Sequence, residues 1–298
     1  MNICFCPSTE DNNSVVVTEG AGCCQANHED NETQSRTVTT ETPPAAPGAP
    51  LEYREERLQD GSVYKGQWRG TQREGEGTVK LTDGAEYSGQ WKADQRHGKG
   101  RLVDTAGSVY DGEFLNGRTH GHGVFVRADR SKYEGQWVED QQSGRGLEEW
   151  PNGGQYEGQY LAGLKHGEGF LIWEDGSRYK GGFQESNIHG NGAYHWADGR
   201  KFVGEWRKNQ MHGNGSFEWP DGRTYTGQYV NDQKEGTGVF LWPDGREYNG
   251  QWAKGKQHGG GTYTSSTGQK RNGEWQEGRR KKWIEDPLPA GTNAEDKK

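Results

Sequence analysis

The sequence predicts an all-β protein, built as one array of antiparallel β-hairpins. Three observations lead to this prediction: a motif that returns every 23 residues, an alternation of large and small residues within it, and a turn signature between its two halves. The motif starts with "YKGQW" at residues 64–68, and its later copies start at residues 87, 110, 133, 156, 179, 202, 225, 248 and 271. Because no insertion separates these ten copies, we expect one structural unit that stacks on itself along the chain.

The first half of each repeat is expected to form a strand with an aromatic face. Tyr64, Gly66 and Trp68 occupy alternate positions, and a period of two places all three on one side of a strand. The middle position is glycine in every copy, which is needed if a neighbouring ring lies flat against the backbone; a ligand that touches this backbone is the alternative. The glycines are Gly66, Gly89, Gly112, Gly135, Gly158, Gly181, Gly204, Gly227, Gly250 and Gly273.

The second half of each repeat is expected to form the partner strand. It begins with a G-x-G pair, such as Gly75 and Gly77, and continues in alternation through Val79 and Leu81. An Asp-Gly or Asn-Gly pair follows in most copies, and a short turn between two alternating segments predicts a hairpin. Because one hairpin is barely stable in water, we expect the hairpins to stack at a strand spacing of about 4.8 Å, with aromatic columns along one face. Five later copies place Trp in the last column: Trp150, Trp173, Trp196, Trp219 and Trp242.

Aromatic rings supply most of the apolar surface of this chain. Leu, Ile, Val and Phe together number only 37 of 298 residues, a share that is typical of disordered proteins. The chain also contains 12 Trp and 13 Tyr, and rings that bury roughly 150–250 Å² each can replace an aliphatic core. We therefore expect an ordered array over residues 51–283, held together by aromatic packing.

The segments on either side of the array have a different composition. Residues 1–50 contain seven acidic residues and one Arg and end in "PPAAPGAP", which predicts a disordered acidic tail and a Pro-rich linker. Residues 284–298 are expected to be a disordered C-terminal tail. The start of the chain lacks the apolar stretch of a secretory signal, which favours a cytoplasmic location.

The charge and the polar residues exclude several classes of function. Residues 1–50 carry −6 of the net charge of −8, so the array lacks the excess of Lys and Arg that a nucleic-acid groove needs. No acid–base pair stands isolated in an apolar setting, so we expect neither enzyme activity nor a cofactor. Six histidines share one column, but neighbouring copies about 10 Å apart cannot share a zinc ion, so no metal site is expected. The column contains His97, His120, His166, His189, His212 and His258.

Two short segments suit attachment to a membrane surface. Four cysteines lie near the N-terminus, where palmitoylation of two of them would anchor the protein; a zinc site and ordinary thiols are the alternatives. They are Cys4, Cys6, Cys23 and Cys24. A basic run after the last repeat would attract anionic lipid, and a solvated end of the array is its alternative. This run consists of Arg279, Arg280, Lys281 and Lys282.

The combination of Y-x-G-[QE]-W, G-x-G and D-G at a 23-residue period resembles the MORN repeat (membrane occupation and recognition nexus) over about residues 51–283. The resemblance implies an elongated, twisted, single-layer array of antiparallel hairpins, with aromatic residues along a shallow groove. It also implies a membrane-apposed or cytoskeletal scaffold. Ala106, Arg130 and Thr267 break the Asp-Gly pattern and Arg271 replaces a Tyr, so their repeats are expected to be locally weaker.

We therefore expect a non-catalytic scaffold, peripheral at a membrane or at the cytoskeleton, that offers its aromatic face to a protein partner. An extended peptide or an amphipathic helix would lie in the groove with the five-Trp column as the contact zone; packing of these rings within the array is the alternative. The rival hypotheses are a structural subunit of a cilium or axoneme and a regulatory module for a separate phosphatidylinositol phosphate kinase. Anionic lipid is a second expected partner, and the open sheet edges would permit a homodimer.

Overall fold

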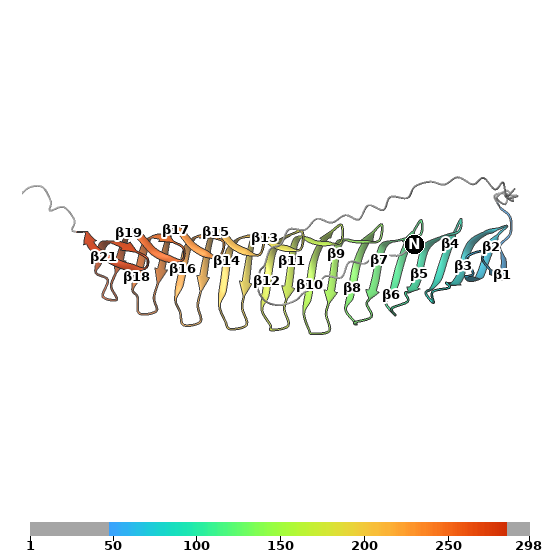
Figure 1. The fold of residues 1–298 in the computed structure, drawn as a ribbon, viewed down its shortest axis with the longest axis horizontal. Helices are drawn as coiled ribbons and strands as arrows, with labels where there is room; N and C mark the ends of the chain where they lie inside the picture. The colour runs from blue at the N-terminus through green and yellow to red at the C-terminus, as the bar shows by residue number, and fades with distance from the viewer. Residues whose placement is uncertain (1–47, 285–298) are drawn as a thin grey trace, which may run out of the picture. The chain divides into compact units, whose positions relative to one another are not determined.

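The computed structural model describes residues 48–284, and these residues form one antiparallel sheet of 21 strands without a helix. Each strand pairs with the strands before and after it in the sequence, so the sheet is an unbroken meander (Figure 1). The all-β fold of repeated hairpins predicted from the sequence is confirmed.

Two kinds of strand alternate along the sheet. Seven-residue strands carry the Y-x-G-x-W motif: β2 (Val63–Arg69), β4 (Glu86–Lys92), β6 (Val109–Leu115), β8 (Lys132–Val138), β10 (Gln155–Leu161), β12 (Arg178–Gln184), β14 (Lys201–Arg207), β16 (Thr224–Val230), β18 (Glu247–Ala253) and β20 (Lys270–Gln276). Nine-residue strands carry the G-x-G pair: β3 (Gln72–Lys80), β5 (Gln95–Val103), β7 (Arg118–Val126), β9 (Gln141–Glu149), β11 (Leu164–Ile172), β13 (Asn187–His195), β15 (Gln210–Glu218), β17 (Gln233–Leu241) and β19 (Lys256–Thr264). The edge strands are β1 (Glu52–Arg57) and β21 (Arg279–Ile284).

Two different turns complete each repeat. The predicted Asp-Gly turn follows each nine-residue strand; at residues 81–85, the Leu81 amide donates to the Ala85 carbonyl at 2.8 Å, and the Ala85 amide donates to the Asp83 side chain at 3.0 Å. A two-residue turn follows each seven-residue strand, and in it Ala93 and Asp94 have φ of 46° and 64°. Positive φ at both positions is the type I′ geometry that suits the twist of a hairpin.

A continuous chain of edge-to-face ring contacts holds the repeats together. The Tyr64 ring meets Trp68 of its own repeat at a centroid distance of 5.0 Å and Trp91 of the next repeat at 5.2 Å. The same two contacts recur through to Trp275, with centroid distances from 4.8 to 5.8 Å. Every ring in this chain is buried. Edge-to-face pairs contribute roughly 0.5–1.5 kcal/mol each beyond the area that they bury.

Paired glycines make room for the first ring of each repeat. Gly66 pairs with Gly77 across β2 and β3, and the Tyr64 ring lies over both, so that its hydroxyl donates to the Gln67 carbonyl at 3.0 Å. A Cβ on either glycine would overlap Tyr64. The predicted contact between ring and glycine backbone is therefore confirmed, and the tyrosine occupies the space that a backbone ligand would need.

The glutamine of the motif closes a β-bulge. The pairing of β2 with β3 shifts in register just after Gly66, where Gly75 has a φ of +75°. The Gln67 side chain fills this kink and accepts a hydrogen bond from the Glu76 amide at 2.7 Å. Bulges leave backbone groups unpaired and bend a strand. A Gln or Glu at this position restores the missing partner, which explains why the motif reads [QE].

Substituting alanine for a glycine beneath a ring is expected to destabilise the array. In Gly261→Ala, the new Cβ would lie 2.7 Å from Tyr248, and overpacking of this kind costs about 1–3 kcal/mol. The adjacent Gly260 has no atom within 4 Å of such a Cβ, so Gly260→Ala is the matched control and should not destabilise. Thermal unfolding followed by circular dichroism measures both, and equal midpoints for the two variants would contradict the packing account.

The repeats with altered turns keep their hydrogen bonds. Arg130 stands where other copies have glycine, with a φ of 73°, and its amide still donates to the Arg127 carbonyl at 2.8 Å. A left-handed conformation costs a non-glycine residue about 1–2 kcal/mol. The predicted local weakness therefore has a physical basis at Arg130, whereas Gly107 and Gly268 keep the glycine at the equivalent positions.

Exchanging these two residue types is expected to move stability in opposite directions. Arg130→Gly relieves the left-handed strain and should gain about 0.5 kcal/mol, the strain less the extra unfolded-state entropy of glycine. Gly107→Ala, at a φ of 89° with open space around it, should lose about 1 kcal/mol. Chemical unfolding of the two variants beside the parent protein measures both effects; a destabilised Arg130→Gly variant would show that the turn is not strained.

Candidate functional site

The two faces of the sheet differ in chemistry. The aromatic face carries the buried ring chain, and it also carries three further columns that begin at Arg73, Val79 and Leu81. The opposite face carries polar contacts between neighbouring strands, such as Thr78 to Ser88 at 3.0 Å. Among the described residues, no second layer covers the aromatic face. Any partner that binds through apolar contacts would therefore meet this side of the array.

Five tryptophans form a partly exposed ladder, here called the Trp band, near the Asp-Gly turns. Its members are Trp150, Trp173, Trp196, Trp219 and Trp242. Trp173 and Trp196 each pack on Tyr194, at 4.9 and 4.4 Å between ring centroids. Trp219 contacts Phe217 at 4.3 Å. The rings thus pack within the array and keep part of their surface accessible; their role as a partner groove stays a prediction.

Arginines from the turns cover part of the Trp band. In the "WPDGR" turn at residues 219–223, Arg223 lies over the Trp219 ring at 5.5 Å, and its Nε donates to Asp221 at 2.7 Å. Arg200 and Arg246 repeat this arrangement over their own tryptophans. The Asp–Arg pair fixes a cation above each ring, so the exposed rim of the band alternates aromatic and charged groups.

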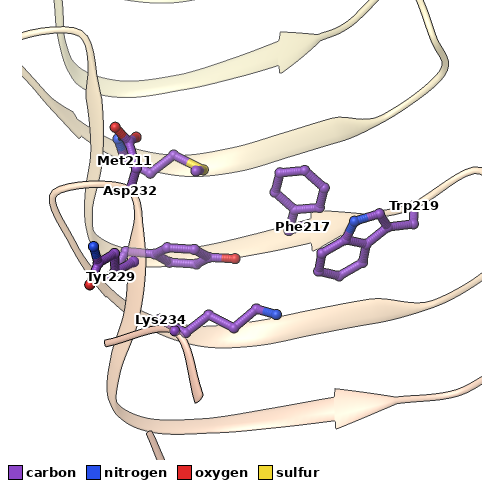
Figure 2. Close-up of a pocket in the computed structure, with 8 residues that line it drawn as sticks. Met211, Phe217, Trp219, Tyr229, Asp232 and Lys234 are labelled. Atoms are coloured by element: carbon purple, nitrogen blue, oxygen red, sulfur yellow. The ribbon is translucent and has the colours of Figure 1, made fainter. Parts of the chain in front are cut away.

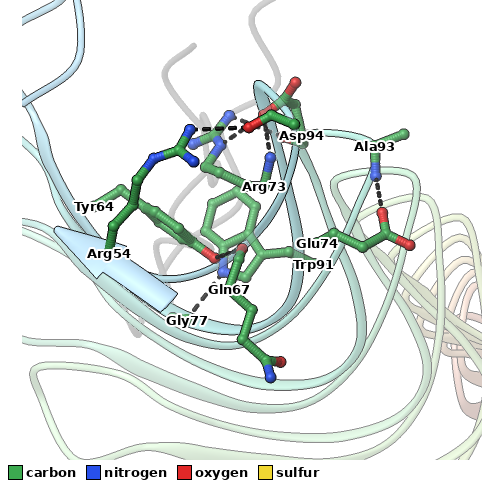
Figure 3. A network of polar contacts seen from close by, with 10 residues as sticks. Arg54, Tyr64, Gln67, Arg73, Glu74, Gly77, Trp91, Ala93 and Asp94 are labelled. Carbon is green, nitrogen blue, oxygen red and sulfur yellow. Dashed lines mark hydrogen bonds and ion pairs between the residues drawn. The ribbon is translucent and has the colours of Figure 1, made fainter. Parts of the chain in front are cut away.

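The column that begins at Arg73 caps the ring chain near the two-residue turns. The Arg73 guanidinium lies 4.3 Å from the Trp91 ring centroid, and both its Nε and its backbone amide donate to Asp94, at 3.1 and 2.8 Å (Figure 3). Asp94 belongs to the two-residue turn of the next repeat, so this contact ties neighbouring repeats together. Later copies place Arg96, Thr119, Gln142, Lys165, Ile188, Met211, Lys234 and Gln257 in this column.

One copy holds a buried ionic cluster, here called the Glu148 cluster. The Glu148 carboxylate, only 6% exposed, pairs with Arg127 at 3.1 Å and Lys165 at 3.4 Å. It also accepts a hydrogen bond from the Tyr160 hydroxyl at 3.1 Å. A buried charge is tolerated when it is paired and hydrogen-bonded in this way. The tyrosine, the lysine and the carboxylate come from three neighbouring strands, β10, β11 and β9.

Three repeats later the same tyrosine and lysine stand without the carboxylate. Tyr229, Lys234 and Phe217 each follow Tyr160, Lys165 and Glu148 by 69 residues. They line a shallow recess of about 240 Å³, here called the Lys234 recess (Figure 2). Figure 2 shows the Tyr229 hydroxyl and the Lys234 side chain both directed toward the space beside Phe217 and Trp219. Met211 and Asp232 complete its walls.

The polar groups of this recess lack the partners that the Glu148 cluster provides. The Tyr229 side chain is 2% exposed, and its hydroxyl has no hydrogen-bond partner. Within the described residues, Lys234 forms no ion pair within 4.0 Å. Four rings surround its ammonium group at 4.8 to 5.1 Å, those of Trp219, Tyr225, Phe240 and Trp252.

Burial lowers the pKa of Lys234 to about 8, and the nearby positive charge of Arg223 lowers it further in the same direction. Cation–π contacts with four rings offset part of the lost hydration but leave the charge without a counterion. The recess thus holds a cation that a negatively charged group would stabilise. This feature was not predicted from the sequence, because it depends on which residues of different strands become neighbours.

Replacing Lys234 is expected to change how stability depends on pH. The folded pKa of about 8 lies below the model value of 10.5, so the unfolded chain binds more protons between these values and stability rises with pH there. Lys234→Met removes the buried ammonium, and its advantage at pH 7 should be of order 1 kcal/mol after allowance for solvent screening and should fade by pH 10. Apparent melting temperatures at pH 7, 8, 9 and 10 measure this difference.

The control for this pH series is Lys180→Met, which changes an exposed lysine on the polar face of β12. It should leave the pH dependence of the melting temperature unchanged. A constant offset between the parent protein and Lys234→Met across the whole pH range would contradict the lowered pKa.

The other residues singled out in the sequence lie apart from the recess. The basic run forms most of the edge strand β21, where Arg280 stacks on Trp283 at 4.2 Å and Lys282 pairs with Glu274 at 3.1 Å. Cys4, Cys6, Cys23 and Cys24 lie outside the described residues. Within residues 48–284, no group of three or more His, Cys, Asp or Glu side chains could hold a metal ion. No helix long and apolar enough to cross a membrane occurs in the same part of the chain.

Comparison with known proteins identifies the repeat. The MORN repeat family matches nine consecutive segments, residues 64–86, 87–109, 110–132, 133–155, 156–178, 179–199, 202–222, 225–245 and 248–270. No curated protein matches the chain at a significant level.

Among solved structures, the TCP10 domain of Danio rerio CPAP in complex with a peptide of Danio rerio STIL is 12% identical, with a TM-score of 0.42 over 79% of this chain and 100% of that chain. The TCP domain of Drosophila melanogaster SAS-4 with a proline-rich motif of Ana2 is 16% identical, with a TM-score of 0.32 over 64% of this chain and 99% of that chain. These TM-scores are too low to support conclusions about partners or activity.

Proposed function

Because this chain belongs to the MORN repeat family, we propose that its array is a non-catalytic scaffold whose aromatic face binds a partner polypeptide. The observation that carries the proposal is the uncovered aromatic face, along which the Trp band stays partly exposed. Partly exposed aromatic residues flanked by arginines are the composition of binding hot spots. An extended peptide or an amphipathic helix, lying along the band, would bury the rings that the array leaves open.

The form of the array supports this role. Each repeat contacts its neighbours, and the edge-to-face chain runs through all of them, so the array presents a long surface of fixed spacing. Contacts at the Trp band recur at each 23-residue step, whereas the columns beside it change from copy to copy. A partner would therefore gain repeated aromatic contacts and would be selected by the residues that vary.

Attachment of this scaffold to a membrane is a separate part of the proposal. It rests on the cysteines of the N-terminal segment and on the basic run of β21, in which the Arg279 and Lys281 side chains are exposed. Two acyl chains would give stable anchoring, whereas one gives only marginal binding. Membrane fractionation of the full chain, beside a variant with all four cysteines changed to serine, tests this part. Equal partitioning of both proteins would exclude acylation as the anchor.

Peptide binding is tested with a library of random 12-residue peptides displayed on phage, selected against the full chain. Trp173→Ala removes one ring of the Trp band and should weaken the selected peptides by about 10- to 30-fold, as expected for an aromatic hot spot. Val203→Ala is the matched control, since Val203 is 44% exposed and lies on the polar face of β14. Fluorescence anisotropy with labelled peptides gives the dissociation constants.

Selected peptides that bind the parent protein and both variants equally would contradict the use of the aromatic face. Circular dichroism of Trp173→Ala accompanies the binding measurement, so that a loss of folding is not mistaken for a loss of contact. Recovery of no binding peptide at all would remove the support for the proposal.

A further inference from the structure

The Lys234 recess has the form of a site from which one group is missing. The Glu148 cluster, 69 residues earlier, has the same tyrosine and lysine on equivalent strands, with a glutamate between them. At the recess, Phe217 takes the place of that glutamate and its ring packs on Trp219 at 4.3 Å. The protein itself thus shows which chemical group this pair of side chains holds.

We propose that the Lys234 recess binds a glutamate side chain of the partner polypeptide, whose carboxylate takes the position that Glu148 holds in its own cluster. This inference rests on the proposed function, because it names the anchor by which a peptide on the aromatic face is recognised. Lys234 supplies the positive charge and Tyr229 the hydroxyl donor. The walls formed by Met211, Phe217 and Trp219 contact the methylene stem.

The unsatisfied groups give the reason for binding. A buried hydroxyl without a partner costs about 1–3 kcal/mol, and the Tyr229 hydroxyl is in that state at 2% exposure. Lys234 has four aromatic neighbours but no counterion. A carboxylate would satisfy both groups at once through charge-assisted hydrogen bonds, which are roughly twice as strong as neutral ones.

Other charged groups around the recess agree with a single carboxylate. Asp232 lines the wall, but its side chain accepts the Met211 amide at 2.8 Å and is not paired with Lys234. Arg223, on the Trp219 side, is paired with Asp221. One uncommitted cation and one hydroxyl match one carboxylate, whereas a phosphate group would need more donors than these two.

The first test uses no peptide and asks whether the recess accepts a carboxylate. Phe217→Glu places a carboxylate where Glu148 stands in its cluster, and Phe217→Gln is the matched control that has the same shape without the charge. At pH 7 the Glu variant should melt several degrees above the Gln variant, although a charge at a buried position ordinarily lowers stability. A Gln variant that is as stable or more stable would overturn the inference.

The second test measures recognition of the peptide with the C-terminally amidated peptides selected from the phage library. Changing one glutamate of the peptide to glutamine should weaken binding to the parent protein about tenfold. The same change should have no effect on binding to Lys234→Met, and the weaker Tyr229→Phe variant should retain part of the preference. A glutamate preference that survives in Lys234→Met would overturn the inference.

The self-filled variant gives an independent check of the same binding event. Phe217→Glu should lose the preference for glutamate over glutamine in the peptide, because its own carboxylate occupies the recess, while Phe217→Gln should retain it. Peptides that bind through Trp173 but show no glutamate preference would overturn this inference and leave the proposed function standing. Failure to recover any peptide would weaken the proposed function, whereas the stability comparison would still decide whether the recess accepts a carboxylate.

The acidic N-terminal segment of the chain is the competing occupant. Residues 1–50 include seven Asp and Glu residues, and a variant with these changed to Asn and Gln shows whether they act in cis. If that variant binds the selected peptides with unchanged affinity, the recess is free for a partner. A tenfold gain in affinity would show that the chain fills its own recess and would overturn the assignment to a partner.

Discussion

The contact between each first-column ring and a pair of glycines is the constraint on which the rest of the array depends. Tyr64 lies over Gly66 and Gly77 with no room for a Cβ at either position. In that position its ring edge reaches Trp68 and Trp91. A single-layer sheet has no second layer to pack against. The rings are therefore buried by neighbours along the array, and cohesion comes from contacts between adjacent repeats.

Polar side chains of the motif satisfy the backbone that this packing distorts. The bulge opposite Gln67 exposes an amide, and the Gln67 side chain accepts it. At the rim, Asp94 accepts the amide of Arg73 in the preceding repeat, and Asp140, Asn209 and Asp232 do the same for their own neighbours. Residues that resemble surface decoration in the sequence therefore complete the hydrogen bonding of the sheet, as buried backbone groups require.

The columns outside the ring chain are free to differ, and the chemistry of the array varies there. The position of Glu148 is taken by Leu171, Tyr194, Phe217 and Phe240 in later copies, and the position of Lys165 by Ile188, Met211 and Lys234. In the Glu148 cluster the two columns neutralise each other; at the Lys234 recess they do not. A regular scaffold can in this way carry local sites of different charge without any change in backbone.

The sequence by itself determined the period, the two-strand unit, the Asp-Gly turn and the burial of the Tyr–Gly–Trp face, because each depends on residues within one repeat. The two-residue turn escaped prediction, since pairs such as Ala93–Asp94 and Glu185–Ser186 carry no glycine to signal positive φ. The Lys234 recess also required the tertiary structure. Its lysine, tyrosine and phenylalanine come from β17, β16 and β15, and the bulge in each repeat shifts the register that would align them by simple counting. Only the folded sheet decides which columns meet across strands, because charge pairing depends on distance in space and not on the period of the sequence.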